Sequence, residues 1–266
     1  MVMMNPSRLQ LPLLLLTAAC FLIAVFHQMG HETAQEIQSK LAKHFGASSQ
    51  GSQPQPSFEQ IALKFGTDKV TDHNYQDMYE KYVSPLRNNR VKMLEIGLGC
   101  NMEYGPGASY YLWLEYLSDV ELYYIESERP CADKYKDKTS NAHVFVGDQA
   151  DKAFLDHFAA DTTVDGLFDI IIDDGGHTME QQITSLEHLW PVVKPGGVYI
   201  IEDLQTSFWP DFGGDPSTQN RARLTTMKYI YHAIDDLMVK RESRTISHDL
   251  LSVDCMAEIC TLQKRK

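Results

Sequence analysis

Two pairs of acidic residues and one histidine are the side chains of this sequence best suited to chemistry. Each pair directly follows a short apolar run, the first at residues 170–172 and the second at residues 198–201. Carboxylate oxygens are the ligands that hard divalent cations prefer, and an imidazole exchanges its proton near neutral pH. The pattern therefore indicates a cation or acid–base site. Its candidate members are Asp173, Asp174, His177, Glu202 and Asp203.

The elements around these residues predict that the two acidic pairs meet. Both apolar runs read as buried strands, and the segment between them has a helical pattern that ends near Trp190, before a Lys-Pro-Gly-Gly turn. A strand, a helix and a second strand in this order form a unit with parallel strands. Ligands of open α/β sheets collect at the carboxyl ends of such strands, so both pairs should line one rim.

Three earlier strands are predicted to bring further polar residues to the same rim. The strand at 91–96 runs into a glycine-containing turn, the strand at 122–125 ends on an acid, and the strand at 144–146 ends on Gly-Asp-Gln. Alternation of strands and helices predicts an α/β fold, a Rossmann-like doubly wound sheet that is mostly parallel. The segments 250–254 and 258–263 should close its edge as an antiparallel C-terminal hairpin.

Composition limits the number of domains and the kinds of partner. A chain of 266 residues with 43% hydrophobic content can build one sizeable core. The net charge of −12 argues against nucleic-acid binding. The five cysteines show no CxxC spacing, so we expect thiols in the core or on the surface, and neither a zinc site nor a disulfide scaffold.

The N-terminal 30 residues predict a membrane anchor or signal anchor. Residues 9–31 carry no formal charge, and about 20 apolar residues are enough to span a bilayer. We predict a single-pass helix at about residues 9–29 because no small-residue cleavage site is evident after it. Arg8 on the near side favours a lumenal catalytic domain, whereas the absence of an Asn-x-Ser/Thr sequon points the other way, so the side stays open.

A stalk helix and a flexible linker should connect this anchor to the folded domain. Residues 31–45 have helical composition, and residues 46–57 are rich in Gly, Ser, Gln and Pro. We therefore assign residues 31–57 to the stalk and linker and 58–266 to the catalytic domain. The domain should begin with helical segments around a Gly-Thr-Asp-Lys turn that could reach or cover a ligand.

Several motifs in this order resemble those of class I S-adenosylmethionine-dependent methyltransferases. The combination of FGTDK, PGAS, GDQAD, IIIDDGGH and IIEDLQTSFWP is more narrowly similar to the metal-dependent sugar O-methyltransferases of macrolide biosynthesis, the mycinamicin type. The similarity covers about residues 58–264. One departure is Gly176, where that group often carries serine, and another is the membrane-type N-terminus.

This resemblance implies an S-adenosyl-L-methionine cofactor, a Mg²⁺ ion and a small-molecule hydroxyl acceptor, such as a sugar or a secondary metabolite. It assigns the metal ligands Asp174, Glu202 and Asp203, with His177 as the general base. The cofactor-binding residues implied are Glu95, Gly97, Gly99, Glu126, Asp148, Gln149 and Asp173.

Other interpretations remain open on the sequence. Asp174 could cap the following helix, and Glu126 could be a solvated strand end. A membrane-anchored glycosyltransferase would suit an anchor, a stem and acidic ligands, although its D-x-D motif is missing. A non-catalytic S-adenosylmethionine-binding protein would lack turnover. A dinucleotide-dependent oxidoreductase ranks lower because Met102 replaces the third glycine of its motif. Neither the acceptor nor the presence of a homo-oligomer can be read from the sequence.

Overall fold

The computed structural model describes residues 55–266 apart from 103–104 and 221, and residues Pro56–Lys266 form one compact unit. The predicted anchor at residues 9–29 and the stalk lie outside the described residues. Within the described part of the chain, no helix combines the length and apolar character needed to cross a membrane.

Seven strands form one sheet with the order β3-β2-β1-β4-β5-β7-β6. Strands β1 to β5 pair in parallel, and β7 pairs antiparallel with both β5 and β6, as predicted. The strands are β1 (Arg90–Ile96), β2 (Asp119–Glu126), β3 (Ala142–Val146), β4 (Phe168–Asp173), β5 (Val193–Ile201), β6 (Leu250–Met256) and β7 (Ile259–Lys264). The helices are α2 (Phe58–Phe65), α3 (Gln76–Tyr82), α4 (Ala108–Tyr116), α5 (Arg129–Tyr135), α6 (Lys152–Thr162), α7 (Met179–Leu189) and α8 (Thr226–Val239).

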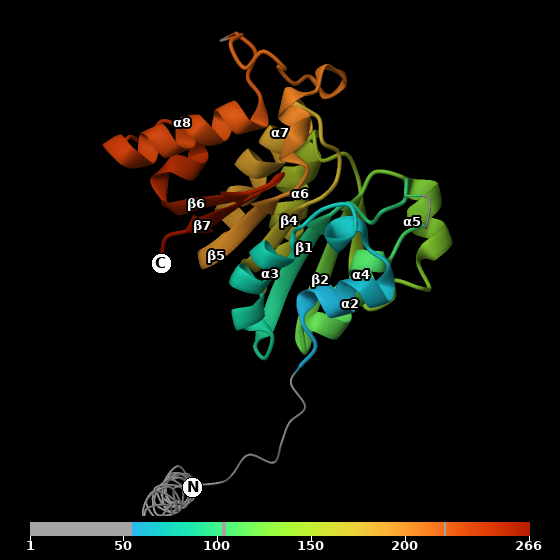
Figure 1. Cartoon of the computed structure of the whole chain (residues 1–266). Coiled ribbons are helices and arrows are strands. Elements are labelled where there is room, and N and C mark those ends of the chain that lie inside the picture. The colour runs from blue at the N-terminus through green and yellow to red at the C-terminus, as the bar shows by residue number, and fades with distance from the viewer. Residues whose placement is uncertain (1–54, 103–104, 221) are drawn as a thin grey trace, which may run out of the picture. The chain divides into compact units, whose positions relative to one another are not determined.

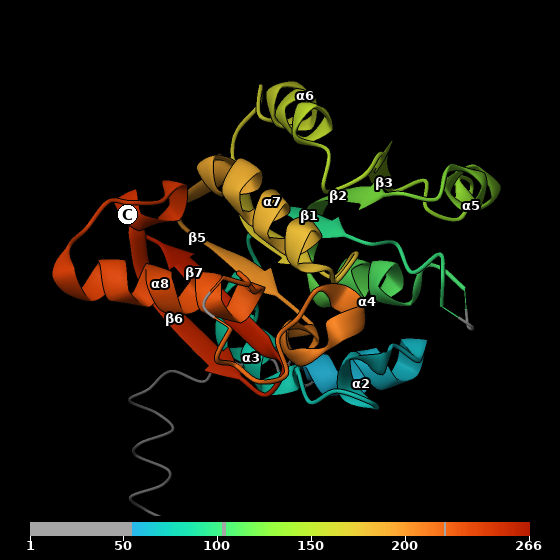
Figure 2. The ribbon, with the colours of Figure 1, turned by 90° about the horizontal axis from the view of Figure 1, so that it is seen from above.

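Helices cover both faces of the sheet (Figures 1 and 2). Helices α2, α3 and α4 lie on one face, and α6, α7 and α8 lie on the other. Alternate residues of a strand point to opposite faces, so Met93 of β1 belongs to the first core and Leu94 to the second. The predicted doubly wound architecture is therefore confirmed.

The lead-in helix α2 starts and ends for local reasons. Ser57 and Gln60 form a reciprocal capping box at its N-terminus, and Gly66 ends it in the left-handed conformation at φ 69°. Its apolar face buries Phe58 against Tyr79 and Trp113, with ring centroids 4.6 and 5.6 Å apart. This aromatic packing anchors the segment that follows Gly66 over the end of β1.

The Lys-Pro-Gly-Gly segment is a strand, where the sequence predicted a turn. Strand β5 begins at Val193, which pairs with Phe168, and the register then shifts before Val198 pairs with Ile170. Gly196 adopts φ 83°, so the glycines let the strand bulge and continue.

The expectation of unpaired cysteines is wrong in the described part of the chain. Cys100 is bonded to Cys131, and Cys255 is bonded to Cys260. The second bond joins β6 to β7 across the hairpin. The first joins the loop after β1 to helix α5. Its two cysteines are 31 residues apart in the sequence, so the fold brings them together and no local spacing indicates the bond.

Gly97 should be indispensable for the close approach of β1 to β4. Its φ is 96°, and a Cβ added there would lie 2.1 Å from the carbonyl oxygen of Asp174. Gly97→Ala should therefore lower the free energy of unfolding by roughly 1–3 kcal/mol beyond the conformational penalty of about 1 kcal/mol. Gly66→Ala is the control, since φ is 69° but no atom lies within 4 Å of the added Cβ. Equal losses in urea denaturation would contradict this account.

Candidate active site

A cleft of about 250 Å³ opens at the carboxyl ends of the central strands. Most of the residues that the sequence assigned to a site line it, together with Thr67 and Asp68 of the lead-in turn. These predicted residues are Gly97, Gly99, Glu126, Asp148, Gln149, Asp174, His177 and Asp203.

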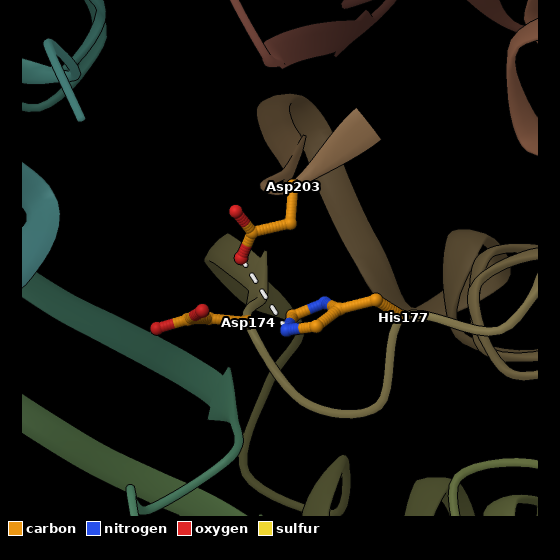
Figure 3. A group of neighbouring side chains, drawn as sticks. All are labelled: Asp174, His177 and Asp203. Atoms are coloured by element: carbon orange, nitrogen blue, oxygen red, sulfur yellow. Dashed lines mark ion pairs between the residues drawn. The ribbon is translucent and has the colours of Figure 1, made fainter. Parts of the chain in front are cut away.

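Asp174, His177 and Asp203 converge at one end of this cleft (Figure 3). The backbone N–H of Asp174 donates to the carbonyl of Ile96, which fixes the end of β4 against the end of β1. His177 Nε2 lies 3.3 Å from Asp203 Oδ2, and Asp174 lies near both residues. One ligand atom from each of the three residues lies within 4.8 Å of the others. The arrangement suits either a cation or a proton-transfer pair.

The backbone turns sharply where β5 ends, and this separates Glu202 from Asp203. Strand β5 stops at Ile201, and Asp203 adopts φ 55°, a left-handed conformation that few residues other than glycine take. Asp203 consequently faces the cleft. The Glu202 side chain points into the protein and is 1% exposed.

Glu202 is held by a buried lysine that the sequence analysis did not single out. Lys69 Nζ lies 2.8 Å from both oxygens of Glu202 and 2.6 Å from Asp174 Oδ2. Its distance to Glu95 Oε1 is 3.4 Å. The hydroxyl of Tyr79 also donates to Glu202. One ammonium thus connects carboxylates that follow or belong to three different strands.

The end of α2 and the short turn after it place Lys69 in this position. After Gly66 ends α2, the side chain of Thr67 caps a short 3₁₀ turn, Asp68–Val70, by accepting from the N–H of Lys69. The Lys69 side chain is then directed inward and is 1% exposed. The FGTDK motif was the available signal, but composition alone favours a solvated lysine in such a turn.

Burial and the neighbouring charges shift the pKa values of this cluster in opposite directions. Burial raises the pKa of Glu202 to about 7, and the Lys69 ammonium opposes that rise. The pKa of Asp174 is also raised by burial, again against the effect of Lys69. Burial alone would lower the pKa of Lys69, but the neighbouring carboxylates of Asp174, Glu202 and Glu95 raise it well above its ordinary value. The Lys69 side chain therefore stays protonated and positively charged although it is buried.

Glu126 and Gln149 organise the other end of the cleft through backbone contacts. Glu126 is buried, and its two oxygens accept from the N–H groups of Leu98 and Glu128 at 3.1 and 2.8 Å. It is therefore not a solvated strand end. Gln149 Oε1 accepts from the N–H of Gly176 at 2.6 Å, which ties the loop after β3 to the loop after β4.

Two residues assigned to cofactor binding lie beneath the cleft instead of lining it. Glu95 Oε2 accepts from Ser109, Trp113 and Tyr124, and its side chain is fully buried. Asp173 accepts from Gln149, Ser185 and Tyr199 and is equally buried. Their part in cofactor binding stays a prediction, and their visible role is to support the residues above them.

The alternative role of Asp174 as a helix cap is wrong. Thr178 is the N-cap of α7, and it forms a reciprocal capping box with Gln181. Asp174 is left free of the helix and available to the cleft.

Aromatic residues border the cleft beside His177. The loop after β5 forms two 3₁₀ turns, Leu204–Phe208 and Pro210–Phe212. The Phe212 ring lies 6.5 Å from the His177 ring and 5.8 Å from the Trp209 ring, measured between centroids. Phe208 and Trp209 are 39% and 47% exposed, so the loop that brings Phe212 to His177 also leaves large apolar surface open to solvent.

The fold and this arrangement correspond to a methyltransferase. A family described as "Methyltransferase domain" matches residues 102–204. The chain therefore contains a methyltransferase domain, and it resembles the class I S-adenosylmethionine-dependent methyltransferases, in particular the macrolide sugar O-methyltransferases.

The named relatives include two O-methyltransferases from Streptomyces. The 8-demethyl-8-alpha-L-rhamnosyl tetracenomycin-C 2'-O-methyltransferase of Streptomyces olivaceus is 34% identical over 183 residues, which are 68% of this chain and 46% of that protein. Demethylmacrocin O-methyltransferase of Streptomyces fradiae is 35% identical over 185 residues, with 68% and 45% covered. This chain thus spans about half the length of the curated relatives it matches.

A solved structure supports the same relationship. The MycE methyltransferase from the mycinamycin biosynthetic pathway, in complex with Mg, SAH and mycinamycin VI, superposes with a TM-score of 0.71 at 27% identity. The match covers 80% of this chain and 56% of that chain.

The Cys100–Cys131 bond should hold the two walls of the cleft together. Cys100 follows the glycine turn after β1, and Cys131 lies in α5, just after Glu126 and Glu128. Replacing both cysteines by serine should speed amide hydrogen exchange in residues 97–102 and 126–135, because the covalent link between these loops is lost. The Cys255→Ser/Cys260→Ser pair is the control and should leave both segments unchanged. Equal exchange in all three proteins would contradict this role.

Proposed function

We propose that this protein is an S-adenosylmethionine-dependent O-methyltransferase, assisted by Mg²⁺, that acts on a hydroxyl of a sugar or similar small molecule. The observation that carries the proposal is the convergence of Asp174, His177 and Asp203 at one end of a cleft whose other end is formed by the glycine turn. The methyltransferase domain matched at residues 102–204 and the similarity to O-methyltransferases that act on sugars support it.

The cleft suits the methyl donor at its glycine-turn end. Gly97 and Gly99 have φ of 96° and 79°, so the backbone turns without side chains and a ligand can come close to it. Glu126 offers carboxylate oxygens of the kind that a ribose diol would bind. Asp148 is exposed on the same cleft, where an adenine amino group could donate to it.

The opposite end suits a hard divalent cation. Asp174 and Asp203 supply carboxylate oxygens, the ligands that Mg²⁺ prefers, and His177 lies beside them with its Nε2 available to act as a base. Glu202, the third ligand implied by the resemblance, has both oxygens bound to Lys69 in this structure. A magnesium ion held here would orient the acceptor hydroxyl and make it more acidic.

His177 is placed to take the proton of that hydroxyl. The acceptor oxygen would attack the methyl carbon of the sulfonium, the carbon–sulfur bond would break, and S-adenosylhomocysteine would leave. The hydroxyl proton would pass to Nε2 of His177, since this nitrogen is directed toward Asp203 at the proposed cation site. The Asp203 carboxylate, 3.3 Å away, would stabilise the imidazolium that forms.

The aromatic loop after β5 gives the acceptor an apolar surface. A sugar ring has apolar C–H faces that pack on aromatic rings, and Trp209 is exposed beside the cleft. Trp209 and Phe212 are therefore proposed to contact the acceptor. The glycosyltransferase alternative has no comparable support, and a non-catalytic binding role would leave the convergence of His177 with Asp203 unexplained.

Calorimetry with S-adenosylhomocysteine tests the proposal directly. A protein beginning near Ser57 should bind the ligand in buffer with EDTA, because the glycine-turn end of the cleft contains none of the proposed metal ligands. Mg²⁺ should then bind in addition and should alter the heat of acceptor binding. Absence of S-adenosylhomocysteine binding with and without Mg²⁺ would overturn the proposal.

Two substitutions should separate catalysis from cofactor binding. His177→Ala should reduce turnover by roughly 10²–10⁴-fold, as expected for the loss of a general base, and leave S-adenosylhomocysteine affinity unchanged. Glu126→Ala should weaken that affinity by roughly 1–3 kcal/mol because the carboxylate proposed to accept from the ribose diol is lost. His188→Ala is the control, since His188 pairs with Asp156 outside the cleft. Full activity of His177→Ala with any identified acceptor would remove His177 from the mechanism.

We also propose that the domain works in an oxidising compartment, attached to a membrane by a single helix at residues about 9–29. Disulfides persist in oxidising compartments and are rare in the cytosol, and the described residues contain two of them. The apolar N-terminal segment is a sequence-based prediction. In protein isolated from its native membrane, Cys100, Cys131, Cys255 and Cys260 should resist alkylation until a reductant is added. Alkylation before reduction would argue for a reducing compartment.

A further inference from the structure

Lys69 fills the position between two carboxylates that a divalent cation would also use. Its ammonium is 2.6 Å from Asp174 Oδ2 and 2.8 Å from both oxygens of Glu202. Asp174 is also one of the proposed cation ligands, together with Asp203. Glu202 is 1% exposed and has no free oxygen. In this arrangement Glu202 cannot bind a metal ion.

A second position in which the Lys69 ammonium could pair with a carboxylate lies close by. Glu95 Oε1 is buried and accepts no hydrogen bond, although the other oxygen of Glu95 accepts three. This unpaired oxygen is 3.4 Å from Lys69 Nζ, so a small movement of the flexible lysine side chain would give it a partner. Buried carboxylate oxygens are costly to leave unpaired, and an ammonium can satisfy one in either position.

From this geometry we infer that Lys69 and a divalent cation compete for Glu202. Without metal, the ammonium neutralises the pair formed by Asp174 and Glu202. When a divalent cation binds between Asp174 and Asp203, the ammonium shifts to Glu95 Oε1 and Glu202 becomes a ligand. The lysine thereby keeps the buried carboxylates compensated in both states and lowers the affinity of the site for metal. The inference rests on the cation site of the proposed function.

Mn²⁺ binding, measured by the electron paramagnetic resonance signal of the free ion, tests this competition. Lys69→Gln should bind Mn²⁺ at least about tenfold more tightly than the unmodified protein, because a competing charge within a few ångströms has been removed. Lys92→Gln is the matched control. Lys92 is also buried, but its ammonium donates to the carbonyl of Thr162, away from the cleft. Equal or weaker binding by Lys69→Gln would overturn the inference.

A double-mutant cycle with Glu202→Gln separates competition from a simple effect of charge. If the gain comes from releasing Glu202, Lys69→Gln should give no gain in the Glu202→Gln background. A gain of the same size in that background would show that Lys69 acts only through its charge, and the competition would be disproved.

Crystals of the unmodified protein soaked with Mn²⁺ provide a test that does not depend on the folding of any variant. Glu202 should contact the ion and Lys69 should contact Glu95 Oε1. An occupied site with Lys69 still on both Glu202 oxygens would overturn the inference. S-adenosylhomocysteine binding in EDTA, measured in parallel, distinguishes failure of the proposed methyltransferase function from failure of the competition. Its loss would count against the proposed methyltransferase, whereas unchanged Mn²⁺ affinity in Lys69→Gln would count against the competition alone.

Discussion

The interaction on which the rest of the site depends is the burial of one ammonium among three carboxylates. Lys69 joins Glu95 in β1 to Asp174 after β4 and Glu202 after β5, so it fixes the ends of three strands relative to one another. An isolated charge in this position would be very costly, and removing one partner of a buried pair typically costs about 3–5 kcal/mol. The cluster therefore holds together only if the lead-in turn, the sheet and the loop after β5 are all in place.

The lead-in segment is consequently part of the active site, and more than a cover for the sheet. Helix α2 is anchored by aromatic packing, Gly66 ends it, and the next three residues place Lys69 under the cleft. Helix α3 then contributes Tyr79, whose hydroxyl donates to Glu202. Two short helices thereby supply the charge and the hydrogen bond that the strand ends cannot supply themselves.

Sequence patterns predicted the sheet and the convergence at its rim because both follow from local rules. Apolar runs mark the parallel strands, and the carboxyl ends of such strands meet at one edge, so the neighbourhood of Asp174 and Asp203 could be foreseen. Strand geometry also allowed one of Glu202 and Asp203 to be structural, but which of them faces the cleft could not be foreseen, since it depends on one left-handed residue at the end of β5. Lys69 and the Cys100–Cys131 bond were missed for a related reason. Each joins segments distant in the sequence, and no periodicity encodes such contacts.

That left-handed residue gives the site two distinct halves. Had β5 continued as a regular strand, Glu202 and Asp203 would simply have pointed to opposite faces of the sheet. The turn at Asp203 instead sends one carboxylate inward to a fixed counter-charge and the other outward to His177, which is 24% exposed. The inner half can maintain its charge balance without solvent, whereas the outer half remains accessible from the cleft. A strained backbone position is therefore what allows two consecutive acids to serve structure and chemistry separately.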